Sequence, residues 1–404
     1  MASIYPFNAL RPAPGLAGEV CELPYDVMNS EEAREMAKNK PLSFLHVSKP
    51  EIDLELGIDV HSPSVYTKGA ENFDLLQEQG VLLEDSSPCF YLYQQVMDGH
   101  KQVGIVAVAS CEEYDSGIIK KHEYTRPAKE DDRVHHIESL NSQTGPVFLT
   151  YRAMAEIDMF VKDVCNTDPD VDFEAVDGVQ HTSWVLDSKE DIDFLKEQFG
   201  KVEFLYIADG HHRSAAASRV NASRGGAGQS SRFLSVLFPH DQMQILAYNR
   251  AIKTLNGITP ETFLEQLGDV FDANENEGGI CGGKNEICLY MGGQWKALTF
   301  KKDKATAAAP ADELDVALLQ NHVLGPMLGI NDPRTSSQIE FVGGIRGAAE
   351  LEKMVDEGGW ACAFSLYPTS IEDLMEIADS DGIMPPKSTW FEPKLRDAMF
   401  CHKI

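Results

Sequence analysis

Residues 204–220, FLYIADGHHRSAAASRV, change from apolar to charged and then to alanine-rich sequence, which predicts a strand, a turn and a helix. Residues 204–207 are typical of a short buried strand, and residues 214–220 of a helix. The turn between them carries Asp209, Gly210, His211, His212 and Arg213. A helix that begins here presents backbone N–H groups and a partial positive charge, to which Arg213 adds a permanent cation. The stretch therefore predicts a phosphate-binding turn with a carboxylate beside it.

An alternative interpretation of this turn is purely structural. Asp209 could cap the helix, and the neighbouring polar side chains could be solvated. A capped helix does not require two histidines and an arginine in its first turn. The residue types therefore favour a functional turn.

Composition narrows the class of protein. The 404 residues suggest about two or three domains, and 43% hydrophobic with 25% charged residues is typical of a globular enzyme. A formal charge of −29 disfavours nucleic acids and anionic membranes as partners. The N-terminus lacks the features of a signal peptide, and no run reaches the ~18 apolar residues that would span a bilayer. We expect a cytoplasmic protein whose eight scattered cysteines are reduced.

The pattern along the chain predicts an α+β protein with two parts. Residues 1–245 should form an N-terminal α+β domain with a mixed sheet, including a hairpin around Asp98-Gly99. A helix capped by Asn29, with Glu32 three residues later, is expected near the start. Residues 246–404 should form a second, α/β-like domain.

A second charged region lies at residues 118–146. It contains the stretches His122-Glu123-Tyr124-Thr125 and Asp131-Asp132-Arg133. Its carboxylates could hold a divalent ion or accept a proton, and Arg133 could neutralise an anion. An exposed loop of mixed charge is the alternative. A zinc site of the HExxH type is excluded because residue 126 is Arg.

Near the C-terminus, Pro385-Pro386 precede Lys387, Ser388 and Thr389. The prolines predict an extended segment, and an ammonium with two hydroxyls can bind phosphate; a simple surface turn is the alternative. The stretch GGICGGK at 278–284 resembles a phosphate-binding loop, but Asn285 replaces the required Ser or Thr and a strand-like sequence follows.

Four motifs resemble the bacterial domain-of-unknown-function family 1015 over nearly the whole chain and in the same order. They are PYDV at 24–27, KHEYT with EDDR at 121–133, ADGHHRSAAA at 208–217, and MPPKSTWFEPKLRDAMF at 384–400. The family name implies no activity.

The DGHHR turn is also similar to the DGHTR-type turn of free-serine kinases, in the superfamily of ParB-type nucleotidases and sulfiredoxins. This resemblance implies a ParB/sulfiredoxin-like core in which Asp209, His211 and Arg213 lie where nucleotide phosphates are contacted. His212 replaces the threonine of that pattern. Gly210 replaces the sulfiredoxin cysteine, so redox activity is not implied.

Together these features lead to the hypothesis of a phosphotransferase that uses Mg²⁺ and ATP or ADP, with a small hydroxyl metabolite such as free L-serine as acceptor. Donor phosphates would be held by His211, His212, Arg213, Arg133, Lys387, Ser388 and Thr389. Glu123 would be the base, His211 and Lys387 would assist transfer, and Asp209 or Asp131 would bind magnesium.

Two alternatives to the kinase stay open. The first is a metal-dependent hydrolase that uses His122, Glu123, His211 and His212. The second is a nucleotide sensor without an acceptor site. The chain could act as a monomer or a homodimer.

Overall fold

The computed structural model of the protein describes residues 1–226, 228–301 and 309–404. The chain divides into two units. The first comprises Met1–Lys121, Thr125–Met243 and Pro393–Ile404, and the second comprises His122–Tyr124 and Gln244–Glu392. The C-terminal segment therefore belongs to the same unit as the N-terminus, although the whole second unit separates them in sequence.

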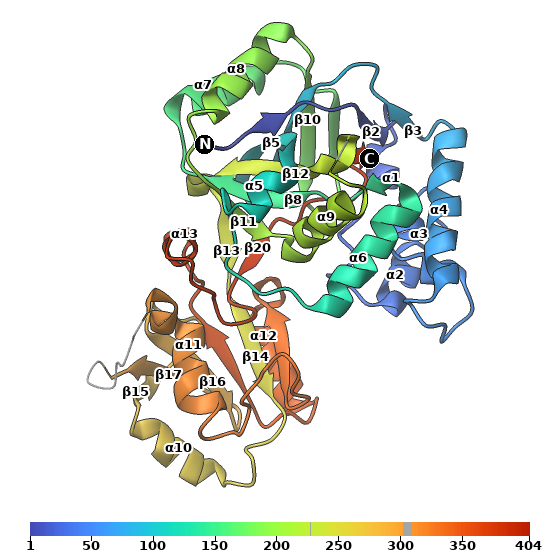
Figure 1. Ribbon diagram of the computed structural model, residues 1–404. Coiled ribbons are helices and arrows are strands. Elements are labelled where there is room, and N and C mark those ends of the chain that lie inside the picture. The colour runs from blue at the N-terminus through green and yellow to red at the C-terminus, as the bar shows by residue number, and fades with distance from the viewer. Residues whose placement is uncertain (227, 302–308) are drawn as a thin grey trace. The chain divides into compact units, whose positions relative to one another are not determined.

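A nine-stranded mixed sheet of the described residues forms the centre of the first unit (Figure 1). Its order is β6-β11-β8-β12-β5-β4-β10-β9, with β1 paired to β5. The pairs β11–β6 and β12–β8 are parallel and the others antiparallel. The strands are β1 (Ile4–Tyr5), β4 (Phe90–Met97), β5 (His100–Ser110), β6 (Ile119–Lys120), β8 (Val147–Tyr151), β9 (Val171–Glu174), β10 (Gln180–Leu186), β11 (Leu205–Asp209) and β12 (Arg232–Pro239). This confirms the expected α+β class with a mixed sheet.

A smaller antiparallel sheet in the same unit has the order β3-β2-β21-β7. Its strands are β2 (Ala9–Pro12), β3 (Leu82–Glu84), β7 (Ser142–Gln143) and β21 (Cys401–Lys403). The helices of the unit are α1 (Ala17–Val20), α2 (Ser30–Met36), α3 (Leu45–Ser48), α4 (Pro63–Glu78), α5 (Cys111–Asp115), α6 (Pro127–Leu140), α7 (Ala155–Val164), α8 (Lys189–Phe199) and α9 (His211–Ser223). Because β21 lies between β2 and β7, the C-terminus is held beside a segment near the N-terminus and a segment from the middle of the unit.

Local sequence signals account for several of these elements. Asn29 caps α2, and Glu32 completes the capping box. Ser188 caps α8 in the same way through the backbone N–H of Asp191. The hairpin of β4 and β5 turns at Asp98 and Gly99, whose φ angles of 50° and 81° match the turn that the pair predicts.

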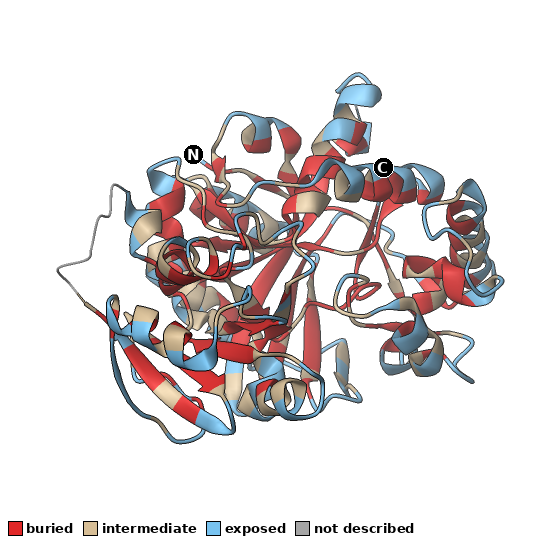
Figure 2. Ribbon diagram, turned by 90° about the horizontal axis from the view of Figure 1, so that it is seen from below, coloured by how far each residue is buried: buried red, intermediate tan, exposed pale blue. Residues whose placement is uncertain are grey.

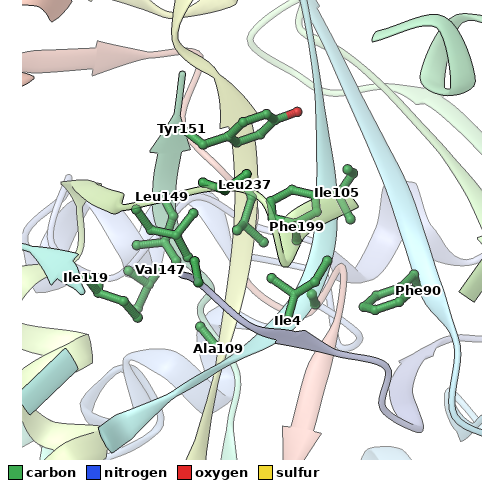
Figure 3. Close-up of a cluster of buried hydrophobic side chains, with 14 of the residues drawn as sticks. Ile4, Phe90, Ile105, Ala109, Ile119, Val147, Leu149, Tyr151, Phe199 and Leu237 are labelled. Atoms are coloured by element: carbon green, nitrogen blue, oxygen red, sulfur yellow. The ribbon is translucent and has the colours of Figure 1, made fainter. Parts of the chain in front are cut away.

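The main core of the first unit lies against the large sheet. Figure 3 shows Ile4, Phe90, Ile105, Leu149 and Phe199 among its buried side chains. Most residues of β5, β8 and β12 are buried, whereas the helices carry both buried and exposed residues (Figure 2). Burial of these apolar strands holds the sheet that positions the turn after β11.

Gly104 of β5 packs closely against β12. A Cβ atom at this position would lie 2.5 Å from Val236 Cγ1 and 2.9 Å from the ring of Phe238 on β12. We expect Gly104→Ala to lower the free energy of unfolding by about 1–3 kcal/mol, because the neighbouring side chains must move. Denaturant unfolding measures this. Gly283→Ala is the control, because no atom lies within 4 Å of a Cβ there and the backbone is not in the left-handed region.

The second unit contains a six-stranded sheet of its described residues, in the order β15-β17-β16-β19-β14-β18. Its elements are β14 (Tyr248–Ile252), α10 (Pro260–Gly268), β15 (Phe271–Glu275), β16 (Glu286–Met291), β17 (Gln294–Phe300), α11 (Asp315–Leu319), β18 (Ile339–Gly343), α12 (Gly347–Asp356), β19 (Cys362–Leu366) and α13 (Ile371–Asp379). β13 (Gln244–Leu246) and β20 (Trp390–Glu392) form a separate pair. The strand pairings among the described residues of this unit are antiparallel, whereas α/β architectures are built on parallel strands, so the expected α/β-like architecture of this part is wrong.

None of the helices described in the structure is both long enough and apolar enough to cross a membrane.

Candidate functional site

The turn after β11 has the strand–turn–helix form that its sequence predicts. β11 ends at Asp209, Gly210 adopts a φ of 101°, and α9 begins at His211. The pairing of β11 with β8 is irregular between Ile207 and Asp209, and such a bulge re-aims the side chain that follows it. The N-cap residue is Gly210, which has no side chain that could cap the helix. The alternative in which Asp209 caps the helix is therefore wrong.

Two cations converge on the carboxylate of Asp209. Lys394 Nζ lies 3.1 Å from Oδ2, and Arg213 Nη2 lies 3.6 Å from Oδ1. The side chains of Lys394 and Arg213 are only 10% and 11% exposed. Burial alone would raise the pKa of Asp209, but Lys394 and Arg213 hold it well below its usual range. Asp209 is therefore ionised at neutral pH, and this cluster of three side chains carries a net charge of +1.

Arg213 is anchored by backbone as well as by charge. Its Nη1 donates a hydrogen bond to the carbonyl of Pro146, which directly precedes β8. A Cβ atom on Gly210 would lie 3.1 Å from its Nε. Burial alone would lower the pKa of Arg213, but Asp209 and other acidic groups raise it. The guanidinium is thus a fixed cation folded back over the start of α9.

The histidines of the turn lie in different environments. His211 is buried and adds to the lowering of the Asp209 pKa, whereas His212 is half-buried. Both occupy the first turn of α9, where backbone N–H groups have no acceptor within the helix. The position of His211 therefore fits a group that assists anion binding.

A small cavity of about 30 Å³ lies next to Arg213 in the first unit. It is lined by residues from the PYDV segment, α6, the segment before β8, β12 and the C-terminus: Tyr25, Arg133, His136, Gly145, Arg213, Phe233 and Asp397 are among them. Arg133 lies over the ring of Tyr25, with Cζ 3.6 Å from the ring centroid. Arg133 also donates to Asp132 Oδ2 from Nε at 3.0 Å and from Nη2 at 2.7 Å. The sequence-predicted residues Arg133 and Arg213 thus line one cavity.

Three residues of this site are not among the sequence-predicted ones, namely Lys394, Asp397 and Tyr25. All three lie in the family-like motifs PYDV and MPPKSTWFEPKLRDAMF, but the chemistry was assigned to Lys387 within the second motif. For Lys394 and Asp397, the available signal is the charge pattern Lys394, Arg396, Asp397 directly before the apolar residues 398–401. Charged residues directly before a buried apolar run indicate polar side chains that lie in the protein interior.

Asp397 is 3% exposed, and its backbone pairs with Glu22. Burial, together with Asp26, raises the pKa of Asp397 to about 7, although Arg213 and Arg133 act to lower it. A carboxyl of this kind is protonated in part at neutral pH.

The raised pKa of Asp397 predicts that the free energy of unfolding depends on pH. Because the folded-state pKa of about 7 lies above the unfolded value, protonated Asp397 stabilises the fold at low pH. That stabilisation is lost as the pH rises through 7. Asp397→Asn should therefore raise the free energy of unfolding by about 2–3 kcal/mol more at pH 8 than at pH 5. Denaturant unfolding in phosphate-free buffer measures this, and an equal effect at both pH values contradicts the assignment.

Asp131 lies on α6, and the alternative of an exposed mixed-charge loop is wrong for this segment. Its side chain is 53% exposed and pairs with Arg219 of α9, with 2.7 Å between Oδ1 and Nη2. Glu130 contacts the same guanidinium at 3.2 Å. Residues two apart on a helix point to different faces, so Asp131 faces solvent while Arg133 is buried. Within the described residues, no group of three or more His, Cys, Asp or Glu side chains is arranged to hold a metal ion.

The remaining sequence-predicted residues, Glu123 and Lys387–Thr389, belong to the second unit. Their segments meet there, because the backbone N–H of Met384 donates to the carbonyl of His122 at 2.8 Å. Lys387 is exposed, and its Nζ lies 5.3 Å from the ring centroid of Tyr248. The roles assigned to Glu123, Lys387, Ser388 and Thr389 stay predictions.

The segment after Pro385-Pro386 is a turn, so the expected extended conformation is wrong. Lys387 has a φ of 61°, and Ser388 Oγ donates to the carbonyl of Pro385 at 2.7 Å. Thr369 Oγ1 donates to the carbonyl of Ser388 at 3.0 Å. Arg250 Nη2 donates to the carbonyl of Lys387 at 2.9 Å. These bonds from distant residues stabilise a left-handed residue that the prolines alone do not dictate.

The rejected phosphate-loop motif is confirmed as structural. Lys284 pairs with Asp373 at 2.8 Å, and β16 rather than a helix follows it.

Comparisons with known proteins show the family and not an activity. Three solved structures are similar in part. A conserved hypothetical protein from Pyrococcus furiosus has 15% identity over 73% of this chain and 93% of its own, with a TM-score of 0.37. A free serine kinase in complex with AMP has 15% identity over 71% and 86%, with a TM-score of 0.37. SbnI from Staphylococcus aureus, truncated at its C-terminus, has 11% identity over 72% and 85%, with a TM-score of 0.40.

Likenesses of this size do not assign an activity. No curated protein is a significant match to the chain. The sequence profile described as protein of unknown function (DUF1015) matches residues 4–317. Since this match covers most of the chain, the protein belongs to the DUF1015 family.

Proposed function

We propose that the turn between β11 and α9 binds the phosphates of a nucleotide, and that the protein is a phosphotransferase. The observation that carries this proposal is the convergence of Lys394 and Arg213 on Asp209 at a helix start whose N-cap residue is a glycine. Two cations with one carboxylate leave a positive charge, and the helix N-terminus adds to it. Phosphoryl transfer depends mainly on such positioning and charge neutralisation.

The donor is ATP or ADP and the acceptor a small hydroxyl metabolite such as free L-serine. Arg213 and the backbone N–H groups at the start of α9 bind the donor phosphates, and His211 assists them. Lys394 is poised to move from Asp209 to a phosphate oxygen, because both are anionic partners for its ammonium. The ParB/sulfiredoxin-like assignment of the first unit is part of this proposal. The oligomeric state, monomer or homodimer, does not alter it.

Magnesium fits this site only together with the nucleotide. Asp209 is ionised, which suits an oxygen ligand, but Lys394 and Arg213 already surround it. Mg²⁺ is commonly bound by one or two carboxylates plus phosphates and water. Asp209 would hold the ion through water, and the ion would neutralise phosphate charge when bound.

The proposal is tested by incubating the protein with Mg-ATP and a panel of hydroxy amino acids and sugars, followed by ³¹P NMR. Formation of a phosphomonoester with one acceptor supports it. No phosphomonoester with any acceptor contradicts the phosphotransferase, and retained ATP binding would then select the nucleotide sensor. Phosphate release without an acceptor, together with stoichiometric zinc, iron or manganese in the purified protein, would instead select the hydrolase.

A further inference from the structure

The cavity beside Arg213 contains the buried carboxyl group of Asp397, to which the described part of the chain offers no hydrogen bond or ion pair. Asp397 is 3% exposed and lines the cavity. Over residues 1–226, 228–301 and 309–404, the structure shows no hydrogen bond and no ion pair to its side-chain oxygens. Its Oδ1 is so close to Gly145 that a Cβ there would lie only 2.6 Å away. Burying an unpaired carboxylate is costly, which indicates that a proton or a ligand completes the site.

Two guanidinium groups line the same cavity. Arg133 uses Nε and Nη2 for Asp132, and the described residues offer its Nη1 no hydrogen bond. Arg213 uses Nη1 for the carbonyl of Pro146 and directs Nη2 toward Asp209. Both side chains are held by these contacts, so their donors are fixed in place. A ligand of this cavity must therefore accept hydrogen bonds from guanidinium groups and also satisfy Asp397.

These two requirements select a class of ligand. An oxyanion satisfies the arginines, but a fully deprotonated one is repelled by the carboxylate of Asp397. Hydrogen phosphate carries both charged oxygens and a P–OH group that can donate to a carboxylate. Sulfate has no such proton. The volume of about 30 Å³ exceeds the roughly 10–15 Å³ that one water molecule needs.

We infer that this cavity binds inorganic phosphate as hydrogen phosphate, with P–OH donating to Asp397 and the other oxygens accepting from Arg133 and Arg213. Asp397 then discriminates phosphate from sulfate. This site goes beyond the proposed function, because it requires neither a nucleotide nor transfer of a phosphoryl group. Arg213 is the residue that the cavity shares with the turn.

The protonation of Asp397 sets the pH dependence of this selectivity. The charged or titratable groups that act on it include Arg213 of α9, Arg133 of α6, Asp26 of the PYDV segment, the adjacent Arg396, and the thiols of Cys21 and Cys401, and Tyr25 and His136 line the same cavity. When Asp397 is protonated it can donate to sulfate, and when it is ionised it cannot. Sulfate binding should therefore weaken as the pH rises from 6 to 8, while binding of hydrogen phosphate persists.

Calorimetric titration of the full-length protein with inorganic phosphate and with sulfate, at pH 8 and matched ionic strength, tests this inference. We expect phosphate to bind at least about tenfold more tightly than sulfate. In Asp397→Asn the amide donates an N–H to either anion, so sulfate should bind about tenfold more tightly than it binds the unmodified protein. The wild-type comparison of sulfate at pH 6 and pH 8 tests the same selectivity without any substitution.

Equal affinity of the unmodified protein for both anions at pH 8 overturns the inference. Absence of binding of either anion also overturns it and shows that the cavity holds only water. ATP titrated in parallel separates this result from the proposed function. Selective phosphate binding without ATP binding supports the cavity site and contradicts nucleotide binding by the turn. ATP binding without selective phosphate binding supports nucleotide binding by the turn and contradicts the cavity site.

Discussion

Asp209→Ala is expected to lower the free energy of unfolding by about 3–5 kcal/mol, because it leaves two buried cations without their shared counter-ion. Lys394 and Arg213 both lie within 4 Å of this carboxylate, and each side chain is about nine-tenths buried. The desolvation of both cations is offset in the folded protein by Asp209. Denaturant unfolding at pH 7 measures the loss.

Asp131→Ala is a matched control from the same protein. It removes the same type of side chain, and its partner Arg219 is also an arginine of α9. Because these side chains are 53% and 44% exposed, we expect a change of no more than about 1 kcal/mol. Similar losses of unfolding free energy in Asp209→Ala and Asp131→Ala would show that the Asp209 cluster contributes no more to stability than an exposed ion pair.

The double variant Asp209→Asn with Lys394→Met distinguishes the contribution of the ion pair to the free energy of unfolding from the contribution of side-chain packing. If Lys394 is destabilising only once its partner has gone, the double variant should recover about 1–3 kcal/mol relative to the sum of the single variants. Strict additivity would contradict the ion-pair explanation. This cycle also guards against interpreting any loss of activity in Asp209 variants as a catalytic effect.

Arg213→Lys is expected to weaken ADP and ATP binding about 10–100-fold, on the proposed function. The ammonium keeps the charge, but it cannot reproduce the planar set of donors that contacts a phosphate and the carbonyl of Pro146 together. Isothermal titration with each nucleotide measures the change. Near-wild-type nucleotide affinity in Arg213→Lys would contradict a role of the guanidinium in phosphate binding.

Arg219→Lys provides the control for this substitution. It lies on the same helix, is 44% exposed and forms ion pairs with Glu130 and Asp131. We expect its nucleotide affinity to stay within about twofold of the unmodified protein, since surface ion pairs of this kind contribute little. Equal loss in both variants would indicate a general effect of arginine on the stability of α9.

Features that depend on neighbouring residues could be predicted from the sequence. The strand, Gly210 and helix of the DGHHR turn are local, as are the Asn29 capping box and the Asp98-Gly99 hairpin. The order of motifs also predicted the family correctly. In each of these cases the backbone preference and the residue that satisfies it lie within a few positions of each other.

Features that depend on helix phase or distant hydrogen bonds could not be predicted in this way. Composition alone does not say that α6 exposes Asp131 and buries Arg133. The prolines before Lys387 suggested an extended segment, but hydrogen bonds from Thr369 and Arg250 stabilise a turn. The antiparallel pairing of the second unit likewise depends on contacts between strands that are far apart in sequence.

Local sequence was enough to specify the strand, the glycine turn and the helix start with its arginine, because these features are adjacent along the chain. Only the tertiary structure brought Lys394 and Asp397 to this turn. The segment Pro393–Ile404 pairs with β2 and β7 through β21, and these contacts span hundreds of residues. Burial in the interior of the first unit, rather than residue type, determines which charged side chains pair with each other. The same burial places the carboxyl group of Asp397 at a cavity.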